Sequence, residues 1–440
     1  MIDHDLAAML RQAAETPFDE ASYMAKGKFK HNLFGDAIAE RHSISKVNGK
    51  LHVFDGRKYR PDYEIINELM TAYNPEITDR QRKETAAYLK YSPRVVEREE
   101  APAKYIPLKS EILNVETMER IPYSSEIVFL QTFAADYPTA PPDVPSVEKY
   151  RRTMADGDGE IMTLLDEFRG YCLYRQNMFR MAVLLYGAQG SNGKSTELEL
   201  LRQFVGEKNA SSLSLQDTAE RFRIVDLYTK SLNAGDDIPA AALRDSSLFK
   251  KLVTGETIYA ERKGEQPFPF KNTAKLIFAA NELPLSSDKT QAYYSRLTIV
   301  PFTHDFARDP EADPEMKEHR WTQAELNAFC WYAVNAFRGV LARGGFTIPK
   351  KCDELMRRYQ TENDPIAAYI DEVGLKGIVD RPTQAVYDDF TKASGYRTGV
   401  TRKKFTRVVK DHFGGLITTK GSRDGGSGPV LQTFALTEEG

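Results

Sequence analysis

Hydrophobic positions in the middle of the chain follow two different periods. The apolar runs 182–186 (AVLLY) and 276–280 (LIFAA) have the length and composition of buried strands. Directly after the first run, Leu198, Leu201 and Phe204 recur at helical spacing. Strands that alternate with helical segments predict an α/β core with a parallel sheet, which we place at residues 181–305.

The residues before this core predict a mixed α+β unit. Helical patterns at 1–40 and 65–90, the second broken at Pro75, lie on either side of two β-prone runs joined by Asp55-Gly56, a strong hairpin signal. A second small β unit is predicted at 105–125, and the four prolines of 137–145 predict an extended linker. We therefore predict an N-terminal α+β accessory domain at 1–145. Residues 146–180 predict an amphipathic helical collar between subunits, with a helix packed on its own core as an equal alternative.

The residues after the core predict a connector and a last domain. Helices at 321–345 and 350–361 make 306–362 a helical connector. Helical patterns at 365–373, 382–394 and 401–412, followed by a β pair, give the order of a winged helix at 363–440. Eight Lys or Arg and one acid lie between Arg397 and Arg423. The third helix is strongly basic and therefore predicts DNA backbone binding, with protein docking as the alternative; its basic residues are Arg402, Lys403, Arg407 and Lys410.

Composition narrows the class of protein. The chain has 440 residues, of which 41% are hydrophobic and 28% charged, and a net charge of −3, as in globular proteins. Its three cysteines form no CxxC pair and predict neither a disulfide framework nor a zinc site. The N-terminus has no signal-peptide pattern and no stretch is apolar enough to cross a membrane, so we predict a cytoplasmic protein without a membrane partner.

The strand–turn–helix at 182–204 carries the strongest chemical signal. Successive backbone N–H groups in a glycine-rich turn wrap around an anion, and the following helix N-terminus adds partial positive charge. Lys194 is predicted to reach the β- and γ-phosphates, and the Ser195 hydroxyl to ligate Mg²⁺. Ala188 stands where the strict pattern has glycine. The predicted nucleotide-binding residues are Gly187, Gly190, Ser191, Asn192, Gly193, Lys194, Ser195 and Thr196.

Three further elements complete a predicted ATPase site. Asp236 and Asp237 follow a β-prone segment, which suits one carboxylate to Mg²⁺ and the other to the attacking water. Asn281 follows the strand 276–280, where an amide can sense the γ-phosphate. Arg296 precedes another β-prone run and is either a surface arginine or an arginine finger for a neighbouring subunit. The alternative without a catalytic role is that the two acids and Asn281 are turn or capping residues.

The order NGKST, paired acids, strand-end Asn and Arg resembles superfamily 3 helicases of the phage- and plasmid-type primase–helicase group, related to poxvirus primase–helicases. The resemblance extends over about 45–305. It implies a P-loop AAA+ core and a β-hairpin that projects into the pore of a hexameric ring. Arg262 and Lys263 would lie near the hairpin tip and contact DNA, although ERKGE alone reads as a solvated turn. Many relatives place a glutamate where this chain has Asp236-Asp237.

The resemblance implies an ATP- and Mg²⁺-dependent helicase that acts as a ring, expected to be a homo-hexamer, on single-stranded and forked DNA in replication of a mobile element in a bacterial host. No zinc ribbon or nucleotidyl-transfer carboxylate set is evident before the linker, so we expect a separate primase or polymerase. The main alternative is an origin-binding initiator or loader that uses ATP as an assembly switch. A packaging or partition ATPase fits less well.

Overall fold

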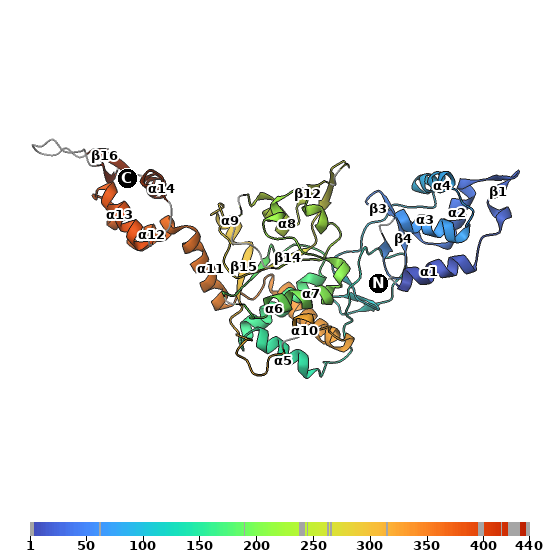
Figure 1. The fold of residues 1–440 in the computed structure, drawn as a ribbon, viewed down its shortest axis with the longest axis horizontal. Coiled ribbons are helices and arrows are strands. Elements are labelled where there is room, and N and C mark those ends of the chain that lie inside the picture. The colour runs from blue at the N-terminus through green and yellow to red at the C-terminus, as the bar shows by residue number, and fades with distance from the viewer. Residues whose placement is uncertain are drawn as a thin grey trace, which may run out of the picture.

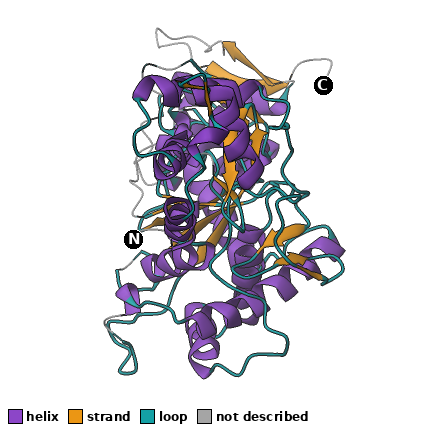
Figure 2. Cartoon of the chain, turned by 90° about the vertical axis from the view of Figure 1, so that its right-hand side faces the viewer, coloured by secondary structure: helices purple, strands orange, loops and turns teal. Residues whose placement is uncertain are grey.

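The computed structural model describes residues 4–60, 63–188, 190–236, 243, 245–261, 264, 266–313, 316–394, 400–414, 416–420 and 432–436. Helices and strands are mixed along the chain (Figures 1 and 2). The α-helices are α1 His4–Glu15, α2 His31–Arg41, α3 Tyr63–Tyr73, α4 Asp79–Tyr91, α5 Pro145–Met154, α6 Gly159–Leu173, α7 Lys194–Val205, α8 Ser247–Thr254, α9 Gln291–Tyr294, α10 Gln323–Arg343, α11 Lys350–Asn363, α12 Pro365–Val373, α13 Thr383–Ala393 and α14 Arg402–Phe413. The strands are β1 Met24–Ala25, β2 Lys28–Phe29, β3 Ile44–Val47, β4 Lys50–Phe54, β5 Tyr59–Arg60, β6 Tyr105–Pro107, β7 Ile112–Asn114, β8 Arg120–Ile121, β9 Ala182–Tyr186, β10 Ala210–Ser211, β11 Leu232–Gly235, β12 Thr257–Ala260, β13 Phe268–Lys271, β14 Lys275–Ala280, β15 Leu297–Pro301, β16 Leu416–Lys420 and β17 Gln432–Leu436.

Several predicted elements are confirmed because their local signals are strong. The Asp55-Gly56 turn joins the antiparallel strands β4 and β5. Helix α10 begins at a capping box in which Thr322 and Glu325 satisfy each other's backbone N–H, and it ends at Gly344 with φ of 73°. The predicted helical stretch 65–90 is divided into α3 and α4, and Thr78 and Gln81 form a second capping box.

The core is a five-stranded sheet with the order β10-β11-β14-β9-β15, and all its neighbouring strands are parallel. The predicted strands 182–186 and 276–280 are its central neighbours β9 and β14. The chain leaves β9 for the far edge, returns strand by strand to β14, and then passes to β15 on the other side of β9. This reversal of direction makes the carboxyl end of β9 a topological switch point, where α/β sheets bind ligands.

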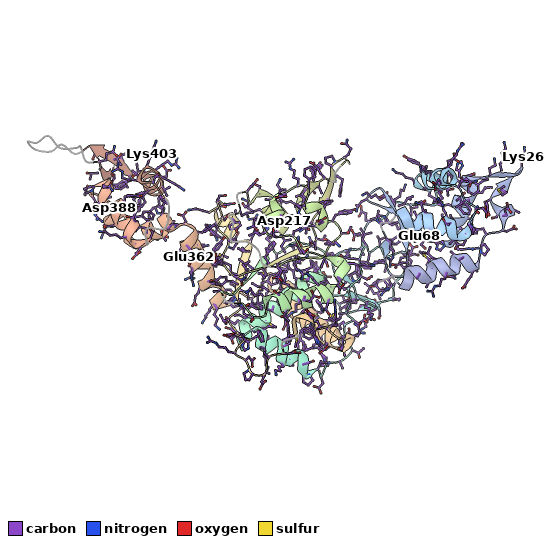
Figure 3. The ribbon with its side chains drawn as sticks, viewed as in Figure 1. Lys26, Glu68, Asp217, Glu362, Asp388 and Lys403 are labelled. Carbon is purple, nitrogen blue, oxygen red and sulfur yellow. The ribbon has the colours of Figure 1, made fainter. Side chains whose placement is uncertain are left out.

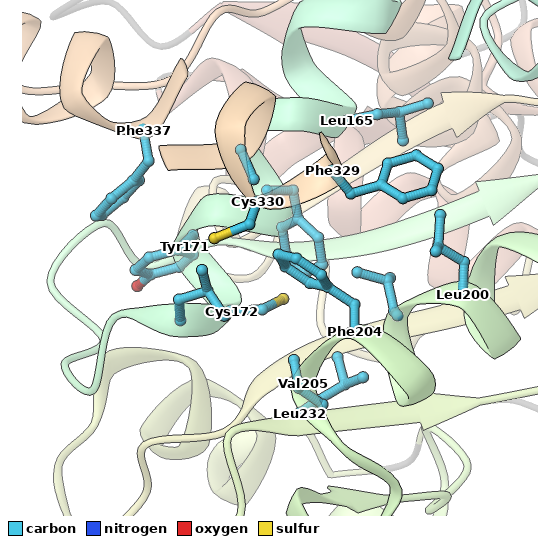
Figure 4. Close-up of a cluster of buried hydrophobic side chains, with 14 of the residues drawn as sticks. Leu165, Tyr171, Cys172, Leu200, Phe204, Val205, Leu232, Phe329, Cys330 and Phe337 are labelled. Carbon is cyan, nitrogen blue, oxygen red and sulfur yellow. The ribbon is translucent and has the colours of Figure 1, made fainter. Parts of the chain in front are cut away.

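Successive side chains of the central strands enter two different hydrophobic clusters, because side chains alternate across a strand. Val183 and Leu185 pack on the face covered by α6, α7 and α10, whereas Ala182 and Leu184 pack on the face covered by α8, α9 and α11. Figure 4 shows the first cluster, in which Phe204 of α7 lies among side chains of α6 and α10. Both faces of the sheet are therefore buried, as parallel sheets require.

The hydrophobic packing changes upstream of the predicted domain boundary. One cluster contains buried residues from Ala13 to Val95, whereas Ile106, Leu113 and Phe133 pack in the same cluster as the core sheet. The small sheet β6–β8 and the proline-rich stretch thus lie against the core. The division at residue 145 stays a prediction, as does the collar, whose helices α5 and α6 pack on α10 and α7 within this chain.

The C-terminal unit has the predicted order of three helices and a β pair. Helices α12, α13 and α14 share a cluster of buried side chains with Leu416 of β16 and Phe434 of β17. Helix α11 joins this unit to the core, and Figure 3 places Glu362, near the end of α11, between Asp217 of the core and Lys403 of α14. The winged-helix assignment remains a prediction.

Cys172, Cys330 and Cys352 are buried free thiols. Burial raises the pKa of the Cys172 and Cys352 thiols to about 12, which makes them unreactive at neutral pH. Among the residues that the structure describes, no helix is long and apolar enough to cross a membrane, and no group of three or more His, Cys, Asp or Glu side chains is placed to hold a metal ion.

Candidate nucleotide-binding site

The loop after β9 has the backbone that a phosphate-binding turn requires. Gly193, at the N-terminus of α7, has φ of 84°, and a Cβ there would lie 2.6 Å from Met154 Sδ. A Cβ on Gly187 would overlap the Asn192 amide. Only glycine fits at these two positions, so the prediction that the turn needs glycine is explained by its packing.

Lys194 is held in place by three oxygen atoms. Its Nζ donates to the carbonyl of Gly187 at 3.0 Å, to Asn192 Oδ1 at 2.7 Å and to Asn281 Oδ1 at 2.9 Å. An ammonium has three donors, and the buried charge needs such partners. The structure therefore brings together Lys194 and Asn281, which lie 87 positions apart in the chain.

Ser195 and Asp236 also meet. The Ser195 hydroxyl donates to Asp236 Oδ1 at 3.1 Å, which joins the start of α7 to the carboxyl end of β11. A hydroxyl and a carboxylate are oxygen ligands of the kind that Mg²⁺ prefers. The chemistry of this donor pair thus fits the predicted metal. Asp237 lies outside the described residues.

These residues line a cavity of about 830 Å³ at the carboxyl edge of the sheet, a size typical of small-molecule sites. Its lining includes the loop, the start of α7, Asp236 and Asn281. A second part of the lining, which we call the apolar part, comes from segments that the sequence did not single out: Met154, Phe306, Ala307, Ala312 and Met316, with Asp309 and Asp313. Except for Gly187, every predicted nucleotide-binding residue lines this cavity.

Arg296 lies at the opposite edge of the sheet. It directly precedes β15, and its carbonyl accepts the backbone N–H of Ala182, the first residue of β9. Because β9 has five residues, about 16 Å of strand separates this edge from the loop. Its Nη1 donates to the Ala292 carbonyl, and its Nε is buried without a partner among the groups the structure describes. Arg296 therefore cannot reach the cavity of its own chain.

The predicted hairpin is formed by β12 and β13, which pair antiparallel from Thr257–Lys271 to Ala260–Phe268. Figure 1 shows it projecting from the core above α8. Arg262 and Lys263 lie outside the described residues, but Gly264 between the strands has φ of 84°, as a tight turn allows. One face of the hairpin packs on the core through Ile258 and Phe270.

The other face of the hairpin carries Tyr259, which is 63% exposed, and the exposed Lys271. An exposed tyrosine on a β-ribbon is a surface on which a nucleic-acid base can stack. Lys50 of β4 contacts the turn end of the paired strands, because its Nζ lies 5.1 Å from the ring centre of Phe268, which pairs with Ala260.

In the C-terminal unit, α14 presents its basic residues to solvent. Arg402, Lys403 and Arg407 are exposed and Lys410 is half-buried, whereas Phe405 and Val409 are buried. Thr401 caps the helix by accepting the Lys404 N–H at 3.3 Å. The predicted basic face is thus solvent-facing, which phosphate contact requires.

A buried ionic network behind α7 was missed by the sequence analysis. Arg169 of α6 donates to Glu197 of α7 at 3.0 and 2.7 Å and to Asp166 at 2.7 Å, and the Tyr150 hydroxyl donates to Glu197 at 3.0 Å. Burial alone would lower the pKa of the Arg169 guanidinium, but the carboxylates of Glu197 and Asp166 raise it above its ordinary value. The available signal was the presence of Asp166 and Arg169 among the apolar residues of one helix, since charges that become buried must pair.

The comparisons with known proteins agree in part with these features. Residues 185–296 match the model of a family of unknown function, DUF5906. Protein 121R of Invertebrate iridescent virus 3 is 25% identical over 54% of this chain and 30% of its own length, and L207/L206 of Acanthamoeba polyphaga mimivirus is 28% identical over 38% and 18%. Protein 184R of Invertebrate iridescent virus 6 is 21% identical over 53% and 29%. All three carry helicase names, and this chain spans less than a third of each.

Two solved structures share the fold. The A form apo structure of the NrS-1 C-terminal region aligns over 92% of this chain and 98% of its own, with a TM-score of 0.54 and 14% identity. A second apo structure of the region (305–718) gives the same TM-score at 13% identity. Likeness at this identity establishes the fold and nothing further.

Proposed function

We propose that this protein is an ATP-dependent DNA helicase of the superfamily 3 type. The observation that carries the proposal is the convergence of Lys194, Asn281 and the Ser195–Asp236 pair at one cavity on the carboxyl edge of a parallel sheet. A sheet edge with these groups suits phosphoryl transfer, which depends on positioning and on charge stabilisation.

Each group has a distinct role in this proposal. Lys194 binds the β- and γ-phosphates, and Asn281, which already contacts Lys194, responds to the γ-phosphate. Ser195 and Asp236 would hold Mg²⁺, which neutralises charge on the phosphates when bound. Asp237 is the proposed base that orients water. The backbone N–H groups at the start of α7 complete the anion site.

The helicase activity is supported by observations outside the cavity. The related viral proteins carry helicase names, the hairpin β12–β13 presents an exposed tyrosine, and α14 presents a basic face. We propose that single-stranded and forked DNA contact the hairpin, including Arg262 and Lys263, and that α14 binds the DNA backbone through a winged helix.

A ring of subunits follows from the proposed role of Arg296. Since this arginine lies at the far edge of its own sheet, a role in hydrolysis needs a second copy of the chain. Head-to-tail contacts that close on themselves form rings, and we propose a homo-hexamer of AAA+ cores with a separate primase or polymerase as partner.

The test is ATP-dependent unwinding of a forked duplex. Lys263→Ala is expected to keep basal ATP hydrolysis within about twofold and to lose unwinding, because a hairpin contact transmits movement to DNA without touching the phosphates. Tyr259→Ala should lower single-stranded DNA affinity by about tenfold through loss of base stacking. Thr257→Ala, on the same exposed face, is the matched control.

Wild-type protein that hydrolyses ATP but never unwinds would refute the helicase. An origin-binding initiator or loader would then be the better account, and a duplex footprint that is lost on truncation after Lys350 would support it.

Asp236→Asn tests the metal site. The substitution keeps the side-chain shape but removes the charge that favours Mg²⁺. We expect ATP hydrolysis to fall about 100-fold while binding of ATP measured in EDTA stays within a few-fold of wild type. Asp226→Asn, a carboxamide substitution at an acid outside the cavity, should change neither quantity. Equal loss of binding with and without Mg²⁺ would contradict the role of Asp236.

A further inference from the structure

The apolar part of the cavity lining contacts the phosphate-binding loop. Met154, at the end of α5, is 4% exposed, and its Sδ and the Phe306 ring both lie within 3 Å of where a Cβ of Gly193 would be. The two side chains therefore flank the loop at the point where α7 begins. A soft thioether and an aromatic ring provide the flat apolar surface on which a nucleobase packs.

The segment that supplies Phe306 is fixed to the loop. The Phe306 N–H donates to the Ser191 carbonyl at 2.9 Å, and the Phe302 N–H donates to the Tyr186 carbonyl at 2.7 Å. Thr303 Oγ1 donates to Asp156 Oδ2 at 2.8 Å, which ties the same segment to the turn after α5. Hydrogen bonds thus join the segment 302–306 both to the phosphate-binding loop and to the turn after α5.

Asp309, which lines the same cavity, is held in place by two hydrogen-bond partners. Its Oδ2 lies 2.9 Å from His304 Nε2, and its Oδ1 accepts the Glu311 backbone N–H at 2.8 Å. The Glu311 N–H and then the His304 ring lower the pKa of the Asp309 carboxyl, so the group is a carboxylate at neutral pH. Each oxygen retains a lone pair, and Asp309 lines the cavity.

From this juxtaposition we infer that Met154, Phe306 and Asp309 form the base subsite and that Asp309 selects adenine by accepting a hydrogen bond from its 6-amino group. The inference rests on the proposed function, because it assumes that the phosphate-binding loop holds a triphosphate. The 6-oxygen of guanine or hypoxanthine is an acceptor and would face a carboxylate unfavourably.

The test compares four nucleotides that differ only in the base. Equilibrium binding to the full chain is measured for ATP, for purine riboside triphosphate, which lacks only the 6-amino group, and for inosine and guanosine triphosphates. Wild type should bind ATP about tenfold more tightly than purine riboside triphosphate, the effect of one charge-assisted hydrogen bond, and inosine triphosphate more weakly still.

Asp309→Ala should reduce the ratio of ATP to purine riboside triphosphate affinity to about one, because the acceptor is gone. This affinity ratio depends on the one contact between Asp309 and the 6-amino group. A substitution that only loosened the segment would weaken binding of both nucleotides alike and would leave the ratio at its wild-type value. Asp309→Asn is a second variant that can retain the bond from the Glu311 N–H and should favour inosine triphosphate relative to wild type. Glu311→Ala is the control, since the Glu311 side chain points to Lys149 at 2.8 Å and does not line the cavity.

The outcomes separate the two proposals. Triphosphates that bind equally well whatever the base, a preference for guanosine triphosphate, or a ratio that survives Asp309→Ala would each overturn the base subsite while leaving the nucleotide site intact. Absence of binding of every triphosphate to wild type, with folding verified by circular dichroism, would overturn the nucleotide site itself and the subsite with it.

Discussion

Lys194→Met is expected to lower ATP hydrolysis by about 10³-fold, the cost of removing one preorganised charge from a phosphoryl-transfer site. Three oxygens, from Gly187, Asn192 and Asn281, hold the Lys194 ammonium at the cavity. Methionine has a similar length but carries neither charge nor N–H. It therefore removes the contact with the phosphates without leaving a large void.

The measurement is steady-state phosphate release, with triphosphate binding followed in parallel. Lys376→Met, which changes an exposed lysine of the C-terminal unit, should have no effect on either quantity. Folding is checked by thermal unfolding, where Lys194→Met should lie within a few degrees of wild type, since Asn281 is exposed and can be hydrated. Hydrolysis at a tenth of the wild-type rate or more would show that phosphoryl transfer takes place elsewhere.

Arg296→Ala is expected to cause the second large loss of ATP hydrolysis. The position of Arg296 in the fold allows a specific test of whether it acts on a neighbouring chain. Removal of an arginine finger costs about 10³-fold or more in hydrolysis, so the variant alone should be nearly inactive. Arg296 lies at the amino edge of the sheet and Lys194 at the carboxyl edge. The two residues that serve one active site would thus come from neighbouring chains.

Mixing Arg296→Ala with Lys194→Met subunits should therefore restore activity. Only one of the two orders of a mixed interface joins an intact loop in one chain to an intact arginine in the next. Random mixing in equal amounts therefore makes about one quarter of all interfaces in a head-to-tail ring productive. Hydrolysis should rise to a comparable fraction of the wild-type rate. Arg308→Ala, which removes a highly exposed arginine of the same chain, is the control. Two inactive variants that stay inactive when mixed and assembled would show that Arg296 acts within its own chain or only in folding.

Local signals in the sequence identified most elements correctly. The helices that begin at capping boxes, such as α4 and α10, and the turn at Asp55-Gly56 were predicted because a few adjacent residues determine the backbone there. The phosphate-binding loop was predicted for the same reason, because its strand, glycine turn and helix start follow one another directly in the sequence.

The boundary between hydrophobic units was harder to predict. Residues 137–144 form neither helix nor strand and Pro145 begins α5. Proline reports on backbone conformation and not on what the chain packs against. Residues 105–137 contact the core because their apolar side chains complete the same cluster as α6 and α10.

By itself, the sequence determined the strand–loop–helix around Lys194, the strand that ends at Asn281, the β-hairpin and the C-terminal order of three helices and a β pair. Only the tertiary structure decided which of these meet. The order of strands in the sheet places β14 beside β9, so that Asn281 reaches Lys194, and places Arg296 at the opposite edge. It also brings Met154 and Asp309 to one cavity from segments about 150 positions apart. The physical reason is that periodicity records which face of an element is buried, whereas contacts between distant elements depend on how those faces pack together.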